Sequence, residues 1–452
     1  MKALSFLATL CLFYLLWKNP AWAQQILPQN PPENAAACRA EIAQAIDSAM
    51  ATGSERGVEI LLVRLADWKK CLPERDTALG NLYHKTGVLC YITDRYADAI
   101  HWFGRALEVR QNNPAAPTES LLNTLNGLTQ THLLSFDFAK AEVFIERQLA
   151  VIRSQKLKNY EAEADLYFAD GQLAFRREDF VRCQEKLRLA ANFYREQNPD
   201  NPNLAHVLNL AGVAADLLGK PGEALQLYRQ AIPVFEKNNL PGDVARSLHN
   251  TGVTFSRLAQ LDSALIFLKK SAAIHLASGD SVEIARHFIE MAKVHSLQND
   301  HPAALDFAQK SHLLRASLLP DWHPDVLESK VFLGQLLLKN NRETEALSLF
   351  ENAIAAAARS PRPDQAIAPM AEKALYLAQK GLKNEDVARQ AHQFYARLDS
   401  LLFLARQQFR QDDSKIAFAQ TVRDIYENAM RNALRLFEST GEPRFFDDAL
   451  AF

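Results

Sequence analysis

The sequence predicts an all-α chain built as a solenoid of about ten antiparallel helical hairpins. Three observations lead to this fold class. Apolar residues recur with helical spacing and show none of the alternation that strands require. Small residues recur about every 40 residues, which indicates an internal repeat. The 19 prolines fall mostly between the periodic stretches, as in Ser360-Pro361-Arg362-Pro363, where they separate one helix from the next.

The N-terminus is typical of a secretory signal peptide over residues 1–23. Lys2 precedes an apolar run that is shorter than the ~20 residues of a membrane span, and Ala21-Trp22-Ala23 fits an A-x-A cleavage site. We expect cleavage near Ala23, a flexible leader over residues 24–34, and export to the periplasm or the extracellular space. An uncleaved N-terminal anchor is the alternative. No comparable apolar run follows, so we expect no membrane span in the mature chain.

The repeat begins in helix pairs that start near residue 76. A small residue lies in the first helix of each pair, and Ala or Cys follows it 12 residues later in the second helix. These small residues allow neighbouring helices to approach closely, and a large residue four positions further on fills the remaining space. The pairs are Gly87 and Ala99, Gly171 and Cys183, Gly212 and Ala224, Gly252 and Ala264, Ala292 and Ala304, and Gly334 and Ala346.

This pattern resembles the tetratricopeptide repeat, whose signature places small residues, an aromatic residue and alanine at the same relative positions. The spacing exceeds the 34 residues of the common form and is similar to the longer repeats of kinesin light chains and many bacterial proteins. The resemblance implies a right-handed superhelical solenoid with a concave inner face. About seven repeats cover residues 76–360.

The pattern weakens at both ends, as in the capping repeats of solenoids. We expect an N-terminal capping helical hairpin over residues 35–75, a degenerate repeat with a long helix over residues 361–411, and an incomplete repeat over residues 412–452. The last segment is similar to the junction of exported bacterial proteins in which such repeats precede a caspase-like CHAT peptidase domain. That resemblance implies a catalytic domain beyond Phe452.

Cysteine positions suggest one disulfide. Cys38 and Cys71 flank the first hairpin at nearly equal distances from its turn at Gly53-Ser54, which predicts a bond in an oxidising compartment. Cys90 and Cys183 occupy packing positions inside helices, and we expect inert core thiols there.

Nothing in the sequence predicts catalysis, a cofactor or a metal site. Phosphate loops, nucleophile elbows and dinucleotide motifs are absent from the sequence, and His287 and His295 are eight residues apart where a zinc helix needs four. A net charge of −2 argues against nucleic acid or an anionic membrane as a partner.

The repeat phase predicts that polar residues of the first helices form a groove for a polypeptide partner. Amide and histidine side chains would bind the partner's backbone, and basic side chains would pair its carboxylates. A solvated helix face is the alternative. Two other functions stay open: a sensor or substrate-holding arm of a peptidase, and glycan binding, which scattered Trp68, Trp102 and Trp322 disfavour. The predicted groove residues are Asn209, Arg246, His249, Asn250, Arg257, Arg286 and Lys293.

Overall fold

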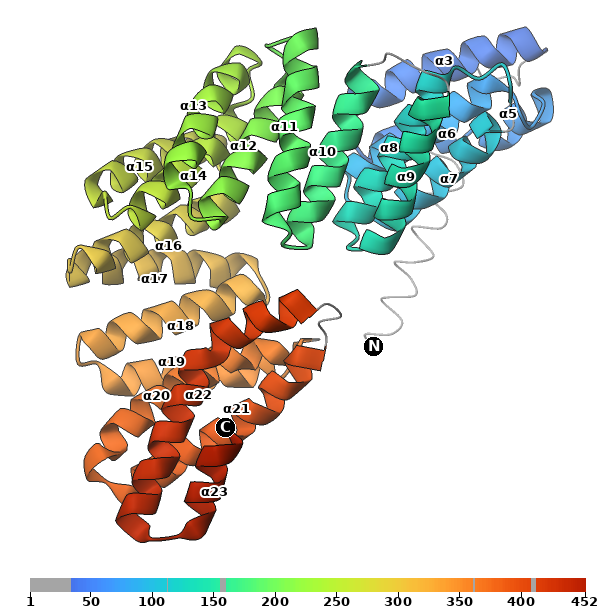
Figure 1. Ribbon diagram of the computed structural model, residues 1–452. Helices are drawn as coiled ribbons and strands as arrows, with labels where there is room; N and C mark the ends of the chain where they lie inside the picture. Colours follow the sequence, from blue (N-terminus) through green and yellow to red (C-terminus); the bar gives the residue numbers. More distant parts are fainter. Residues whose placement is uncertain (1–33, 112, 155–159, 361, 408–411) are drawn as a thin grey trace, which may run out of the picture. The chain divides into compact units, whose positions relative to one another are not determined.

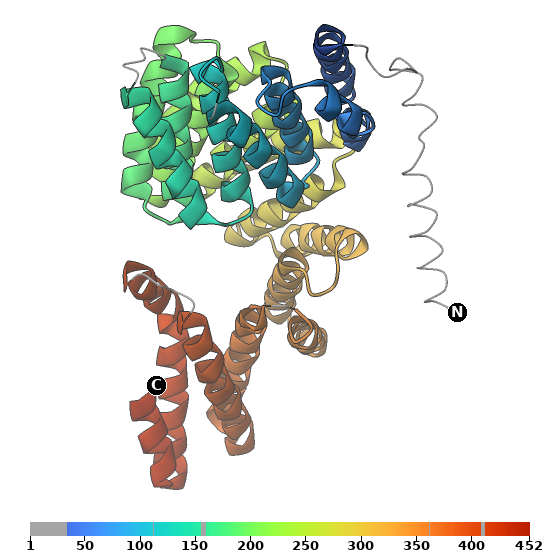
Figure 2. The same ribbon diagram turned by 90° about the vertical axis from the view of Figure 1, so that its right-hand side faces the viewer.

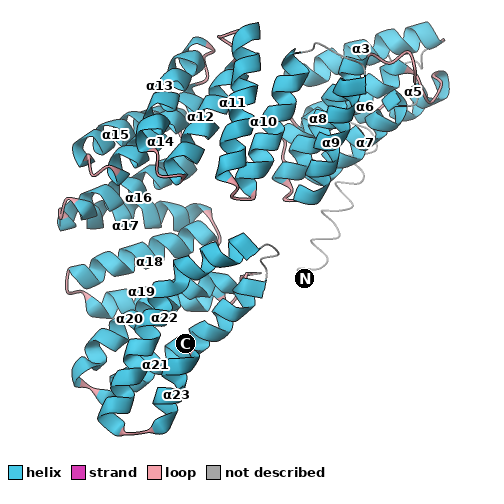
Figure 3. Ribbon diagram, viewed as in Figure 1, coloured by secondary structure: helices cyan, strands magenta, loops and turns pink. Residues whose placement is uncertain are grey.

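The computed structural model describes residues 34–111, 113–154, 160–360, 362–407 and 412–452. Every regular element in these ranges is a helix, and no strand occurs in them (Figure 3). The all-α prediction is therefore confirmed. The predicted signal peptide and nearly all of the leader lie outside the described residues. Within the described ranges, no helix has both the length and the apolar character needed to cross a bilayer.

The chain divides into two units between Leu218 and Gly219. In the first unit, successive helices pack as antiparallel hairpins, which Figures 1 and 2 show from two sides. The helices of this unit are α3 (Ala35–Thr52), α4 (Glu55–Leu62), α5 (Leu65–Cys71), α6 (Thr77–Ile92), α7 (Tyr96–Gln111), α8 (Thr118–Leu134), α9 (Phe138–Ser154), α10 (Tyr160–Arg176), α11 (Phe180–Gln197) and α12 (Pro202–Leu217).

The second unit continues the same construction. Helices α14 and α15, α16 and α17, and α18 and α19 form hairpins whose members pack along their length. The helices are α13 (Pro221–Lys237), α14 (Pro241–Arg257), α15 (Leu261–Ser278), α16 (Ser281–Leu297), α17 (His301–Leu318), α18 (Pro324–Lys339), α19 (Glu343–Ala357), α20 (Ile367–Lys380), α21 (Glu385–Gln407), α22 (Asp412–Thr440) and α23 (Pro443–Ala451), with short 3-10 turns η1 (Pro363–Ala366) and η2 (Gly381–Lys383).

The turn inside most hairpins repeats one geometry. A residue in the left-handed region, such as Asp94, Ala259 or Asn299, ends the first helix with φ between 56° and 59°. The next residue then donates its backbone N–H to the carbonyl five positions earlier, as Gln260 does to Phe255 at 3.0 Å. This is the hydrogen bond of a Schellman motif, which satisfies a carbonyl at the helix end. The motif fixes how sharply the second helix folds back.

The predicted small residues lie where two helices meet. In α14, an added Cβ at Gly252 would lie 2.8 Å from Leu268 Cγ in α15, and Leu268 is fully buried. In the next repeat but one, Gly334 faces the fully buried ring of Phe350 in the same way. In these repeats the large residue therefore occupies the space that the glycine leaves free, as the spacing predicts.

The N-terminal cap differs from a simple hairpin. Its second arm consists of two short helices, α4 and α5, because the backbone leaves the helical region at Arg64. Trp68 on α5 is fully buried in the core of this end. A disulfide joins Cys38 to Cys71, with their Cα atoms 6.5 Å apart. Helices α3 and α4 of the cap pack against α6.

The C-terminal helices α20 to α23 contribute to two apolar clusters, one shared with α18 and α19 and one between α21, α22 and α23. Gly381 lies against the backbone of Ala388, the one small position of the repeat pattern that survives here. Asn432 on α22 donates to the carbonyl of Ala388 at 3.0 Å, and its side chain is buried. This contact joins α22 to α21 through a polar group within an apolar interface.

Candidate functional site

The predicted groove residues fall in both units. Asn209 lies on α12 of the first unit and is buried. The remaining six lie on α14 and α16 of the second unit, which are the first helices of successive hairpins. Helices α14 and α16 contact each other directly. The structure therefore gathers six of the seven predicted residues, Arg246, His249, Asn250, Arg257, Arg286 and Lys293, on two neighbouring helices.

Three of the basic residues among them, Arg246, Arg286 and Lys293, have acidic partners on their own helices. Arg246 pairs with Asp243, and Arg286 Nη1 lies 2.8 Å from Glu283 Oε1. Both arginine side chains are about half exposed, at 59% and 49%. Exposed pairs of this kind are screened by water and contribute little net attraction to a third charge. The preference for an acidic partner therefore stays a prediction, and the local charge near these arginines is balanced.

His249 belongs to a cluster of three imidazole rings. Its ring centroid is 4.8 Å from that of His287, which is 5.3 Å from that of His275. Burial is the main cause that lowers the pKa of His249 to about 3, and burial also lowers the pKa of His287. His287 Nε2 lies 2.5 Å from Ser271 Oγ, inside the helix interface. His249 is therefore a neutral packing residue at neutral pH.

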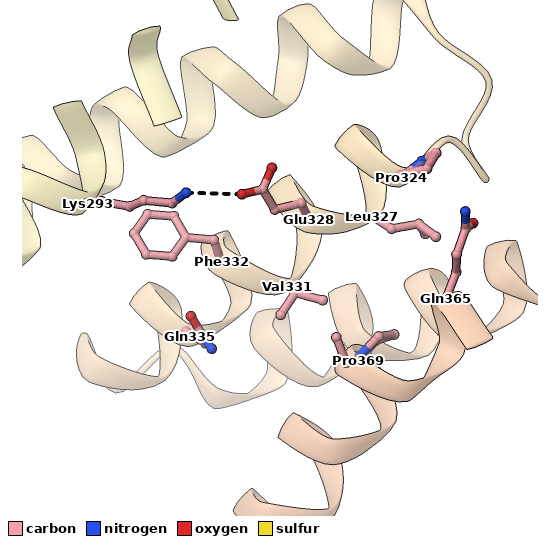
Figure 4. Close-up of a pocket in the computed structure, with 10 residues that line it drawn as sticks. Lys293, Pro324, Leu327, Glu328, Val331, Phe332, Gln335, Gln365 and Pro369 are labelled. Carbon is pink, nitrogen blue, oxygen red and sulfur yellow. Dashed lines mark hydrogen bonds and ion pairs between the residues drawn. The ribbon is translucent and has the colours of Figure 1, made fainter. Parts of the chain in front are cut away.

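A cavity of about 380 Å³ opens beside Lys293, between α16, α18 and the start of α20 (Figure 4). It is formed by first helices of successive hairpins, the same helix face that the repeat phase assigns to the groove. Its walls are mainly apolar, and polar side chains stand at its edge. The lining residues are Lys293, Pro324, Leu327, Glu328, Val331, Phe332, Gln335, Gln365, Ala368 and Pro369.

The charged groups at the cavity are linked by a series of ion pairs. Lys293 Nζ lies 2.8 Å from Glu290 Oε1 and 3.1 Å from Glu328 Oε1. The other oxygen of Glu328 lies 3.0 Å from Nη1 of the buried Arg315. Burial alone would raise the pKa of Glu328, but the two cations outweigh burial and the pKa is lowered. For Lys293, burial would lower the pKa, and the two glutamates raise it instead.

Two glutamines complete the polar edge. Gln335 on α18 donates from Nε2 to Glu372 Oε1 on α20 at 2.8 Å. Gln365 extends from η1 toward α18 in Figure 4. Its Oε1 is buried and has no hydrogen-bond partner among the described residues. A buried carbonyl oxygen without a donor is costly, and the oxygen of Gln365 has almost no accessible surface, so a partner's N–H cannot reach it in this conformation.

Of the predicted groove residues, Lys293 alone lines the cavity. The sequence could also have identified Gln335 as a residue of the cavity. Lys293 directly follows Ala292 and Gln335 directly follows Gly334, so Lys293 and Gln335 occupy the same position of the repeat. No such signal identified Gln365, because it lies in the 3-10 turn η1 before α20, outside the repeat pattern. Tertiary packing alone brings it to the cavity.

Other predicted positions lie in the core. Cys90 and Cys183 are buried free thiols, and burial raises their pKa to about 11 and about 12. Both are therefore protonated and weakly reactive at neutral pH. In the part of the chain that the structure describes, no three His, Cys, Asp or Glu side chains are grouped to hold a metal ion.

Comparisons with known proteins agree with this architecture. Residues 163–237 match the tetratricopeptide repeat family model. The apo form of RapI has a TM-score of 0.57 and 13% identity, over 81% of this chain and 99% of RapI. A Rap protein in complex with Competence and Sporulation Factor has a TM-score of 0.51 and 13% identity, over 83% of this chain and 100% of the Rap chain. A search of curated proteins gives no significant match.

Proposed function

We propose that this tetratricopeptide repeat protein binds an extended segment of another polypeptide on the first helices of its second unit. The observation that carries the proposal is the cavity between α16, α18 and α20 (Figure 4). It lies on the helix face that successive repeats present in register, so a chain lying across these helices passes over it. Apolar walls with a polar edge are the usual construction of a binding pocket.

Two further features support a binding role. Polar side chains link α18 to both of its neighbours, through Lys293 and Glu328 on one side and Gln335 and Glu372 on the other. These links hold the cavity walls in place before a partner arrives, which lowers the entropic cost of binding. A Rap protein of the same fold has been solved in complex with Competence and Sporulation Factor, so a solenoid of this kind accommodates a partner.

The experiment is a selection of linear peptides from a displayed random library on the purified protein. Selected peptides are then tested on two matched variants. Ala368→Trp places a large ring at the cavity, where Ala368 is exposed. Ala355→Trp makes the same change at an exposed position of α19 that does not line the cavity. The proposal predicts that only the first variant loses binding. Peptides that bind both variants like the wild type, or failure to select any peptide, would contradict it.

Export and the peptidase link remain part of the proposal on sequence grounds. The sequence pattern of residues 1–23 predicts a signal peptide and hence a periplasmic or extracellular protein, and N-terminal sequencing of the protein from its source tests cleavage near Ala23. If a CHAT domain follows in the gene, the repeats serve as its sensor or substrate-holding arm. Reading the coding sequence past Phe452 tests this, and a continuation without a caspase-like fold would leave a binding scaffold without that role.

A further inference from the structure

We propose that helices α6, α7 and α8 of the first unit hold a site for a carboxylate group of a ligand. The guanidinium of Arg110 forms its floor, and the side chains of Asn81, Lys85 and Asn123 stand at its edge. The bound carboxylate takes the place that the second unit fills with the carboxylate of its own Glu328. This site lies within the first unit and is independent of the cavity between α16, α18 and α20.

The chain contains the same buried arginine twice, once in each unit. Arg110 on α7 and Arg315 on α17 each follow the small residue of their helix by 11 residues. Arg110 donates from Nη1 to the backbone oxygen of Ser120 at 2.6 Å, and Arg315 donates from Nη1 to that of Asp325 at 2.8 Å. Both acceptors lie 10 residues further along the chain. The two guanidinium groups therefore occupy equivalent places between successive hairpins.

The two arginines differ in their counter-ions. Nη1 of Arg315 lies 3.0 Å from Glu328 Oε2, and Glu328 follows Arg315 by 13 residues. The residue at the same distance after Arg110 is the uncharged Asn123. Burial lowers the pKa of Arg110 to about 10, and no acidic group opposes this effect. Among the described residues, Arg110 is thus a buried cation without a carboxylate partner, which is an unfavourable arrangement.

The neighbouring side chains on α6 add positive charge and no negative charge. Lys85 precedes the small residue of its helix by two positions, where the second unit has Glu290, an acid of the other network. Lys85 forms no ion pair with a residue that the structure describes. Burial, Arg110 and Lys85 together lower the pKa of His84 to about 3, and no acidic group counteracts them. The surroundings of Arg110 therefore favour an anion supplied from outside.

The guanidinium of Arg110 lies at the surface on one side. Arg110 is 7% exposed, and its Nη2 donates at 2.9 Å to Oδ1 of Asn81, which is itself exposed. The second hydrogen of Nη2 has no acceptor among the described residues. Arg315 is buried to a similar degree, at 5%, yet Glu328 reaches it with a side chain that is 47% exposed. A carboxylate arriving from solvent can contact Arg110 in the same way, and the amides of Asn81 and Asn123 offer further donors.

The test uses capped amino acids as probes and the full protein with ¹⁵N-labelled arginine. The Nε–H signal of Arg110 is identified by its loss in Arg110→Gln. N-acetyl-aspartate N-methylamide at millimolar concentration should shift this signal. The asparagine analogue has the same size but no charge, and it should bind weaker by a factor of about 10 or more. Succinate and a capped hexapeptide with one aspartate then distinguish a small acid from a polypeptide, and the tighter binder of the two identifies the source of the carboxylate.

Asn123→Glu supplies the carboxylate from the chain itself, at the position of Glu328. This variant should weaken binding of the aspartate probe about 10-fold or more and should raise the urea concentration at the midpoint of unfolding. Asn123→Gln is the matched control, because its side chain has the same length without the charge, and it should bind the probe like the wild type. Equal binding of the aspartate and asparagine probes would overturn the inference. Equal probe binding by Asn123→Glu and Asn123→Gln, or no shift of the Arg110 signal with any carboxylate, would overturn it as well.

Discussion

Replacing Gly252 by alanine should destabilise the second unit, although alanine favours helices. The added Cβ would lie 2.8 Å from Leu268 Cγ and 3.1 Å from the backbone oxygen of Ala264. Leu268 is fully buried, so it can move aside only by disturbing its neighbours. Overpacking of this kind costs about 1–3 kcal/mol, and the gain in helix propensity offsets up to about 1 kcal/mol of it. We expect a net loss of about 1 kcal/mol in the free energy of unfolding.

The matched control is Gly242→Ala in the same helix, α14, where an added Cβ meets nothing within 4 Å. Gly242 lies in the first turn of the helix, where the propensity gain is smaller than in the interior, so the difference between the two variants gives a lower limit to the packing cost. Urea unfolding followed by far-UV circular dichroism measures it at 25 °C. If Gly252→Ala proves as stable as Gly242→Ala or more stable, the small residue is not required for helix contact and the packing argument is wrong.

The remaining predictions concern pH, the disulfide and the arginines. Burial holds the pKa of His249 at about 3, below its ordinary value of 6.5. Below pH ~6.5 the unfolded chain therefore binds a proton that the folded chain does not. The contribution of His249 to the free energy of unfolding is complete above pH ~6.5 and is about 2 kcal/mol smaller at pH 5. His249→Phe should reduce this dependence of the unfolding free energy on pH in urea titrations. Reducing the bond between Cys38 and Cys71, which closes a loop of 33 residues, should lower the unfolding free energy of the cap by about 3–4 kcal/mol, and unchanged unfolding in reductant would count against it. Replacing Arg246 and Arg286 together by alanine should weaken a selected peptide by less than about tenfold, because both side chains are half exposed and paired; a larger loss in calorimetry would restore the acidic-partner hypothesis.

The sequence was sufficient for the fold because the repeat constrains the same contact many times. The same packing rule governs the contact of Gly252 with Leu268 and that of Gly334 with Phe350. Each repeat therefore supports the helix assignment made from the others. The hairpin turns were less predictable, since residues such as Asp94 and Ala259 adopt the left-handed conformation that sequence patterns assign to glycine. There the backbone hydrogen bonds of the turn outweigh local preference.

The candidate site was predicted only in outline. The repeat phase locates the helix face and includes Lys293, but it does not show which positive charges are already paired. Glu283 lies one turn before Arg286 in the sequence, so that pairing was visible, whereas the contact of Lys293 with Glu328 joins different repeats. The position of Gln365 depends on the 3-10 turn η1 before α20, which the repeat pattern does not describe.

Photo-crosslinking of the tightest selected peptide tests the central claim most directly. Photo-leucine replaces one apolar residue of the peptide at a time, and each peptide is irradiated with the wild type, with Ala368→Trp and with Ala355→Trp; both changed positions are exposed and lie on helices of the same unit. Binding at the cavity predicts a covalent adduct on a cavity-lining residue such as Leu327 or Val331, located by mass spectrometry, in the wild type and in Ala355→Trp but not in Ala368→Trp. Equal adducts in both variants, or adducts only on residues away from the cavity, would contradict binding there.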